Sequence, residues 1–167
     1  MNAGTLYDGI EATYRHILKD VLAVAAFEPL RTGGYVFRYE KASIALVLDK
    51  EDPEFVRLLH MVVHSFKRSD PVALRNAELC AGAVIRKLKL VKIFVQPETN
   101  TEDQSFVTAA VEFLVEDVKT ITVTSLERCL NALKTAQRDF HEYLDEIESA
   151  EGDKPASLPA LASTALN

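Results

Sequence analysis

Two apolar segments with alternating side chains, followed by one long amphipathic segment, dominate the last third of the 167-residue chain. Residues 90–96 and 106–116 alternate two sets of side chains at every second position, which is the period of a β-strand. Residues 125–147 repeat apolar side chains at three- and four-residue intervals, which indicates a helix with one buried face. The sequence therefore predicts a hairpin of two strands covered by a long C-terminal helix.

The first third of the chain predicts a helix followed by three short strands. Thr5 and Asp8 form a helix start signal, and an apolar stripe continues to about residue 26. Residues 27–31, 35–40 and 43–48 are rich in β-branched and aromatic side chains and predict an antiparallel meander. Gly33 and Gly34 precede a strand and no helix, so they indicate a turn and not a phosphate-binding loop.

Two Asp-Pro pairs in the middle of the chain each have the pattern of a helix start. Asp52 with Pro53 predicts a helix over residues 53–66, and Asp70 with Pro71 predicts a second helix that ends near residue 88. Thr124 and Glu127 have the spacing of a capping box for the final helix.

Together these patterns predict an α+β fold in which an antiparallel sheet of about five strands packs against helices in two layers. The expected order is α-β-β-β-α-α-β-β-α. Residues 1–150 are expected to form one domain, because 48% of the residues are apolar and can supply a core. Residues 151–167 lack a helical or strand period and are rich in Ala, Pro and Ser, which predicts a disordered tail.

Charge and hydropathy exclude several function classes. The net charge of −6 argues against a nucleic-acid partner. The one dense basic run, residues 86–92, is interpreted as a solvated helix end, with contact to an acidic protein segment as the alternative. No apolar run approaches the length of a membrane span and no signal peptide is evident, so we expect a soluble, cytoplasmic protein. Cys80 and Cys129 lack metal-binding spacing and are expected in the core.

The order of elements resembles that of type III secretion chaperones and of the YbjN-type family of bacterial sensory-transduction regulators. The resemblance spans residues 5–148 and is carried by residues 90–95, 110–115 and 126–144. It implies a two-layer α+β module, often dimeric, that holds other polypeptides and performs no chemistry. It provides no catalytic residues.

His60 and His64 are the candidate metal ligands. Four residues apart on the expected helix, they would share one face, where two imidazoles can bind zinc. The interval lacks the glutamate of a zinc hydrolase, and on the expected helix both side chains fall on the solvated basic face. We therefore expect no cofactor, with a small-molecule or metal-binding regulator that uses His60 and His64 as the alternative function.

Phe94, Phe106 and Leu114 are the candidate partner-binding residues. They share the second face of the C-terminal hairpin, which is too apolar to remain open to water. Either a helix of this chain, a second subunit or a client segment should cover them. We expect a homodimeric, non-catalytic module that binds a protein or peptide client. A hydrolase or transferase assembled from distant residues stays a third alternative.

Overall fold

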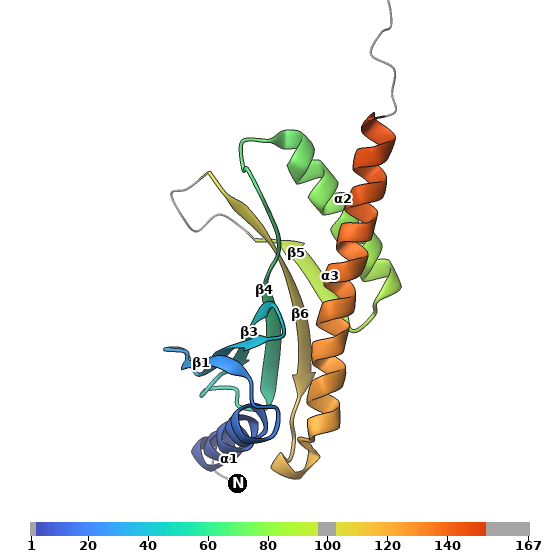
Figure 1. Ribbon diagram of the computed structural model, residues 1–167. Coiled ribbons are helices and arrows are strands. Elements are labelled where there is room, and N and C mark those ends of the chain that lie inside the picture. The colour runs from blue at the N-terminus through green and yellow to red at the C-terminus, as the bar shows by residue number, and fades with distance from the viewer. Residues whose placement is uncertain (1–2, 97–102, 153–167) are drawn as a thin grey trace, which may run out of the picture.

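The computed structural model describes residues 3–96 and 103–152 (Figure 1). The elements in chain order are α1 (Ala3–His16), the π-helical turn η1 (Ile17–Val21), β1 (Ala25–Pro29), β2 (Gly34–Tyr39), β3 (Ala42–Leu48), β4 (Phe55–Phe66), α2 (Pro71–Lys87), β5 (Val91–Val95), β6 (Ser105–Leu114), the 3-10 turn η2 (Val118–Thr120) and α3 (Val123–Gly152). The predicted tail from residue 153 on and most of the predicted hairpin loop, residues 97–102, lie outside the described residues.

The strands form one antiparallel sheet in the order β1-β2-β3-β4-β6-β5. The α+β class and the two-layer arrangement are confirmed, and the predicted meander and C-terminal hairpin are both present. The sheet has six strands, because the segment predicted as the second helix is a strand.

The helix predicted over residues 53–66 is wrong, since this segment is the twelve-residue strand β4. It pairs with β3 on one side and with β6 on the other, so it lies in the middle of the sheet. Asp52 is not a helix cap: its carbonyl accepts the N–H of Phe55 at 3.1 Å in the turn before the strand. A central position supplies backbone partners on both edges, and those long-range bonds outweigh the local Asp-Pro signal.

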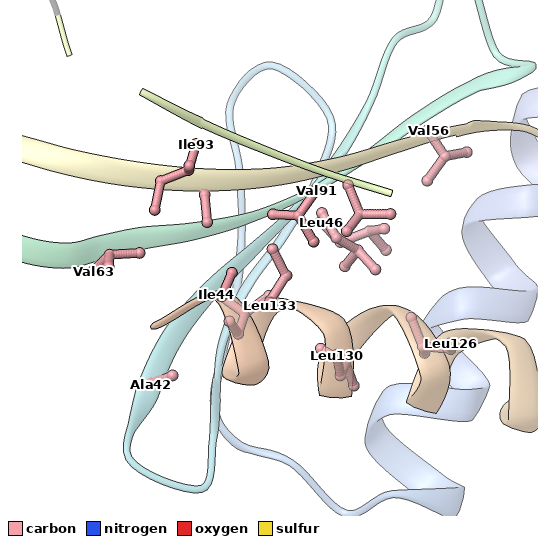
Figure 2. Packing of buried hydrophobic residues seen from close by; sticks show 14 of the residues in the cluster. Ala42, Ile44, Leu46, Val56, Val63, Val91, Ile93, Leu126, Leu130 and Leu133 are labelled. Carbon is pink, nitrogen blue, oxygen red and sulfur yellow. The ribbon is translucent and has the colours of Figure 1, made fainter. Parts of the chain in front are cut away.

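All three helices pack on one side of the sheet. Tyr14 of α1 lines a common cavity with Phe113 of β6 and Cys129 of α3, which places α1 on the same side as α3. Helices α2 and α3 run beside one another along the sheet (Figure 1). In Figure 2 the strands lie over α3, and side chains of both layers meet between them: Ile44, Leu46, Val91, Leu126, Leu130 and Leu133.

The predicted cap is present at the start of α2 and displaced at the start of α3. Asp70 caps α2 as predicted, accepting the N–H groups of Val72 and Ala73 at 3.0 Å each. Helix α3 is capped by Thr122 and not by Thr124: the Thr122 hydroxyl accepts the N–H of Ser125 at 3.1 Å, and the Ser125 hydroxyl accepts the N–H of Thr122 at 3.2 Å. The predicted capping box of Thr124 and Glu127 is therefore wrong, and the pair that caps the helix, Thr122 and Ser125, begins two residues earlier.

The first helix begins before the predicted signal at Thr5 and ends well before residue 26. Helix α1 starts at Ala3, and the helical region stops at Val21 after the π-helical turn. Ala23 and Ala26 then take positive φ angles of 48° and 49°, which a helix cannot contain. Ala23 turns the chain into β1, which begins at Ala25, and Ala26 lies within β1 at the irregularity between Ala25 and Glu28.

Candidate functional site

The face of the sheet away from the helices carries the predicted partner-binding residues, and we call it the open face. Strand register assigns the side chains to it: a row of direct cross-strand partners runs through Val36, Ala45, Leu59, Ala110 and Lys92. The other members alternate with the core along the same strands: Arg38, Ser43, Val47, Phe55, Arg57, Phe94, Phe106, Thr108, Glu112 and Leu114. No helix in the described part of the chain packs on this face.

Register divides the three predicted residues into a pair and a single residue. Phe94 is 41% exposed and lies opposite Thr108, so half-buried Phe106 is its diagonal neighbour on β6. Leu114 is 65% exposed and lies six residues along β6 from Thr108, a separation of about 20 Å along a strand. The open face therefore has two apolar ends, one at Phe94 and one at Leu114.

Charged side chains cross the open face between its apolar ends. Lys92 of β5 is ion-paired with Glu112 of β6, and Arg57 of β4 lies directly opposite Glu112. The Arg57 guanidinium lies over the ring of Phe55, 5.9 Å from its centroid, and Phe55 is the cross-strand partner of Leu114. Cations and an anion in this strip can hold a polar stretch of a bound chain.

Small side chains form the floor of the open face. Ala45 and Ala110 are 4% and 2% exposed although no described helix covers them, so their larger neighbours stand above them. Thr108 is 1% exposed, and its hydroxyl donates to the carbonyl of Met61 at 3.0 Å. Neighbouring side chains of the sheet therefore cover these three small residues.

Sequence analysis missed the contribution of β4 to the open face. On the predicted helix Phe55 and Leu59 share a face and Arg57 lies away from it. On β4 all three share the open face, because they alternate with buried Val56 and Leu58. The alternation was the available signal. It stops at the irregularity between His60 and His64, where β4 gains two residues relative to β6.

His60 and His64 do not lie on a solvated helical face, which corrects the sequence interpretation. His60 is 2% exposed, and its Nε2 lies 3.2 Å from Oε1 of Gln137 in α3. Because that amide oxygen only accepts, His60 donates and carries its proton on Nε2. The His64 ring is 5.7 Å from the ring of Phe140 and 5.8 Å from that of His141.

Burial is the main cause that lowers the pKa of both histidines. Desolvation lowers the pKa of His60, and the hydrogen bond to Gln137 only partly opposes it. Desolvation and nearby His141 lower the pKa of His64, against a smaller opposing effect of Glu148. Among the residues that the structure describes, no group of three or more His, Cys, Asp or Glu side chains is arranged to hold a metal ion.

Cys80 lies in the core as predicted, whereas Cys129 is half-buried and packs against the core. Cys80 is buried, and burial raises the pKa of its thiol to about 11; burial also raises the pKa of the Cys129 thiol. Both are therefore protonated at neutral pH and are poor nucleophiles. In the basic run, Lys87 is ion-paired with Asp139 and Lys92 with Glu112, which leaves a smaller net positive charge than the sequence suggests.

No helix within the described ranges, 3–96 and 103–152, is both long enough and apolar enough to cross a membrane.

The arrangement of one six-stranded antiparallel sheet and three helices on a single face is a YbjN-like fold. YbjN from E. coli, whose structure is described as that of "a putative transcription regulator", superimposes with a TM-score of 0.53 at 11% identity, covering 84% of this chain and 92% of YbjN. An uncharacterized protein from Methanothermobacter thermautotrophicus superimposes with a TM-score of 0.51 at 11% identity, covering 83% of this chain and 98% of that one. The resemblance to the YbjN-type family is thus confirmed at the level of the fold.

No protein-family model matches the sequence, and no curated protein matches it.

Proposed function

We propose that this protein is a non-catalytic regulatory module that binds a polypeptide segment on the open face of its sheet. The observation that carries the proposal is the one-sided packing of the fold. All three helices cover one face, while Phe94 and Leu114 on the other face remain 41% and 65% exposed. Exposed apolar side chains at both ends of a face without a helical cover are typical of a docking surface.

The spacing of the two apolar ends defines the segment that fits. About 20 Å separates Leu114 from the Phe94 end, which corresponds to about six residues of extended chain or about thirteen of helix. A matching segment has two apolar anchors at that interval and polar or charged residues between them. The intervening residues would face Lys92, Glu112 and Arg57.

The burial of the two apolar anchors sets the expected affinity. Full burial of a Phe or Leu side chain contributes about 1.5–3 kcal/mol, and ordering the bound segment offsets part of that gain. Two anchors then support reversible binding, which suits a regulator. YbjN, described as a putative transcription regulator, has the same fold, and this similarity supports a regulatory role over an enzymatic one.

Edge strands offer a second mode for the same partner. Strand β5 is one edge of the sheet and carries Phe94, so an added strand would extend the sheet beside it. The opposite edge, β1, is less suitable because it contains an irregularity between Ala25 and Glu28 and ends at Pro29.

The test is affinity capture by the tagged protein compared with that by an open-face variant carrying Phe94→Ser and Leu114→Ser. A matched control carries Leu79→Ser and Ile85→Ser, which replace two apolar side chains of α2 with similar exposure, 49% and 46%. We expect a near-stoichiometric polypeptide partner that the open-face variant loses and the control retains. Equal capture by both variants would contradict the proposal, provided that circular dichroism shows both to be folded.

Light scattering on the captured species decides whether the partner is a second copy of this chain. The homodimer remains a prediction. In that case the open-face variant should be monomeric and the α2 control should remain dimeric.

A further inference from the structure

A hollow of about 690 Å³ opens between α3 and the turn that joins β2 to β3. Tyr39 and Ala42, the strand residues that flank the turn, form one wall, and α3 forms the other. Tyr39 and Ala42 share the sheet face that packs on the helices, so the hollow lies on the side opposite the open face. Its volume is within the range of about 300–1,000 Å³ of small-molecule sites.

Positive charge is in excess around this hollow. Lys41 lines it from the turn, and Lys134 and Arg138 line it from successive turns of α3. Glu40 is its single lining carboxylate among the described residues, and it accepts from Lys134 Nζ at 2.6 Å. Arg138 also pairs with Asp139 and Glu142, and Asp139 with Lys87, so four cations stand against three carboxylates in and beside the hollow. On a chain of net charge −6, this local excess of one positive charge attracts anions.

Arg138 is held in place and still has donors to spare. Its Nε and Nη2 lie 3.2 Å and 2.8 Å from Oδ1 of Asp139, and the guanidinium keeps the donors of Nη1. Asp139 is in turn fixed by Lys87, 2.8 Å from its Oδ2. An arginine restrained on one side by a buried carboxylate loses less side-chain entropy when it binds a ligand on the other.

Gln137 provides a neutral donor to the same hollow. Its Oε1 accepts from the buried His60, which fixes the orientation of the amide. No described residue accepts from its amide nitrogen, so those two N–H groups are free for a ligand. His141, one helical turn further along α3, lines the hollow beside it.

We propose that this hollow binds a small anionic ligand through a carboxylate or phosphate group. Lys41, Lys134 and Arg138 neutralise the ligand's charge, and the Gln137 amide donates to one of its oxygens. The ligand joins the β2–β3 turn to α3 and is independent of the polypeptide proposed for the open face, since the two sites lie on opposite sides of the sheet.

Calorimetric titration of the full chain with inorganic phosphate and, separately, with citrate tests the proposal. We expect saturable binding of at least one of them, with an affinity that falls as salt is raised. Phosphate alone binding would define the ligand as a phosphate compound, and citrate alone as a polycarboxylate. No saturable heat with either anion would overturn the proposal.

Single substitutions locate the site. Lys41→Gln and Arg138→Gln are each expected to weaken binding about tenfold or more, the loss of one charge-assisted hydrogen bond. Arg138→Lys, which keeps the charge, should retain part of the affinity. Arg128→Gln is the matched control, because Arg128 is an exposed arginine of α3 outside the hollow.

A loss of affinity in Arg128→Gln equal to that in Arg138→Gln would overturn the site assignment, because it would show a general charge effect. The imidazole and Gln137 amide resonances give a second measurement that does not depend on variants. On addition of the anion, the signals of His141 and the Gln137 amide should shift, and those of exposed His16 should stay in place. Shifts confined to His16 would contradict the proposal.

Discussion

Lys87, the last residue of α2, places its Nζ 2.8 Å from Oδ2 of Asp139 in α3, whose side chain has no exposed surface. Arg138 approaches the other carboxylate oxygen at 2.8 Å. Burial opposes the ionisation of Asp139, but Lys87 and Arg138 outweigh it and hold the pKa of the carboxyl below its ordinary value. The pair joins the two longest helices of the layer that covers one face of the sheet.

We expect Asp139→Asn to lower the free energy of unfolding by about 1.5–3 kcal/mol, because it removes charged hydrogen bonds at a buried position. Urea unfolding at neutral pH measures the loss. Glu142→Gln is the control: Glu142 also pairs with Arg138, at 3.5 Å, but both side chains are exposed, so a change below about 1 kcal/mol is expected. Equal losses in the two variants would contradict the assigned role of the buried carboxylate.

Because the pKa values of His60 and His64 are lowered in the folded state, we expect the free energy of unfolding to fall as the solution is acidified from pH 7. The folded state lowers the pKa of both imidazoles, mainly through burial, so the unfolded chain binds more protons near its own pKa of about 6.5. Stability therefore rises with pH across this window, and His60, the more buried of the two, contributes more of the rise than His64.

Urea unfolding of the wild type and of His60→Gln between pH 7 and about pH 5.5 measures this slope, which should be smaller in the variant. His16→Gln is the control, because the His16 side chain is 66% exposed and should leave the slope unchanged. An unchanged slope in His60→Gln would show that His60 does not titrate with unfolding.

Two substitutions at the start of α3 distinguish the observed cap, Thr122, from the predicted cap, Thr124. Thr122→Ala should cost about 1 kcal/mol, because the N–H of Ser125 loses its side-chain acceptor. Thr124→Ala, at the predicted cap, should cost less than about 0.5 kcal/mol, since Thr124 is an exposed residue within the helix. The reverse order of the two losses, measured by thermal unfolding, would place the cap at Thr124.

Gly34 has a conformation and surroundings that exclude a side chain. Its φ is 91°, and a Cβ atom would lie 2.0 Å from the carbonyl oxygen of Leu46 in the neighbouring strand. Gly34→Ala should therefore destabilise by more than about 2 kcal/mol. Gly82→Ala in α2 meets only the end of Arg86 at 3.6 Å and should stabilise by about 0.5–1 kcal/mol. Similar effects of both substitutions on the urea midpoint would contradict this contrast.

The sequence could predict the elements whose local signals agree with their tertiary surroundings. Helix α2 begins at its Asp-Pro signal, and the hairpin of β5 and β6 has an undisturbed two-residue period. Strand β4 could not be predicted in this way. Leu58, Leu59 and Val62 also fit a helical stripe, and the irregularity after His60 interrupts the strand period that would have decided between the two.

The candidate site was accordingly predicted only in part. Phe94, Phe106 and Leu114 lie on one face because they belong to the correctly predicted hairpin. Phe55, Arg57 and Leu59 lie on the same face because β4 is a strand between β3 and β6, and the sequence did not predict that strand. The environment of His60 depends on Gln137, 77 residues away, and no local pattern carries that information.

Photo-crosslinking from the open face tests the central claim most directly. A benzophenone amino acid placed at Phe94 or at Leu114 would lie in the contact with a bound polypeptide, and one placed at Ile85 on α2 matches the exposure of Phe94 away from that contact. The account predicts the same polypeptide adduct from both open-face positions and none from Ile85. Adducts from Ile85 alone, or the same adduct from all three positions, would contradict binding on the open face.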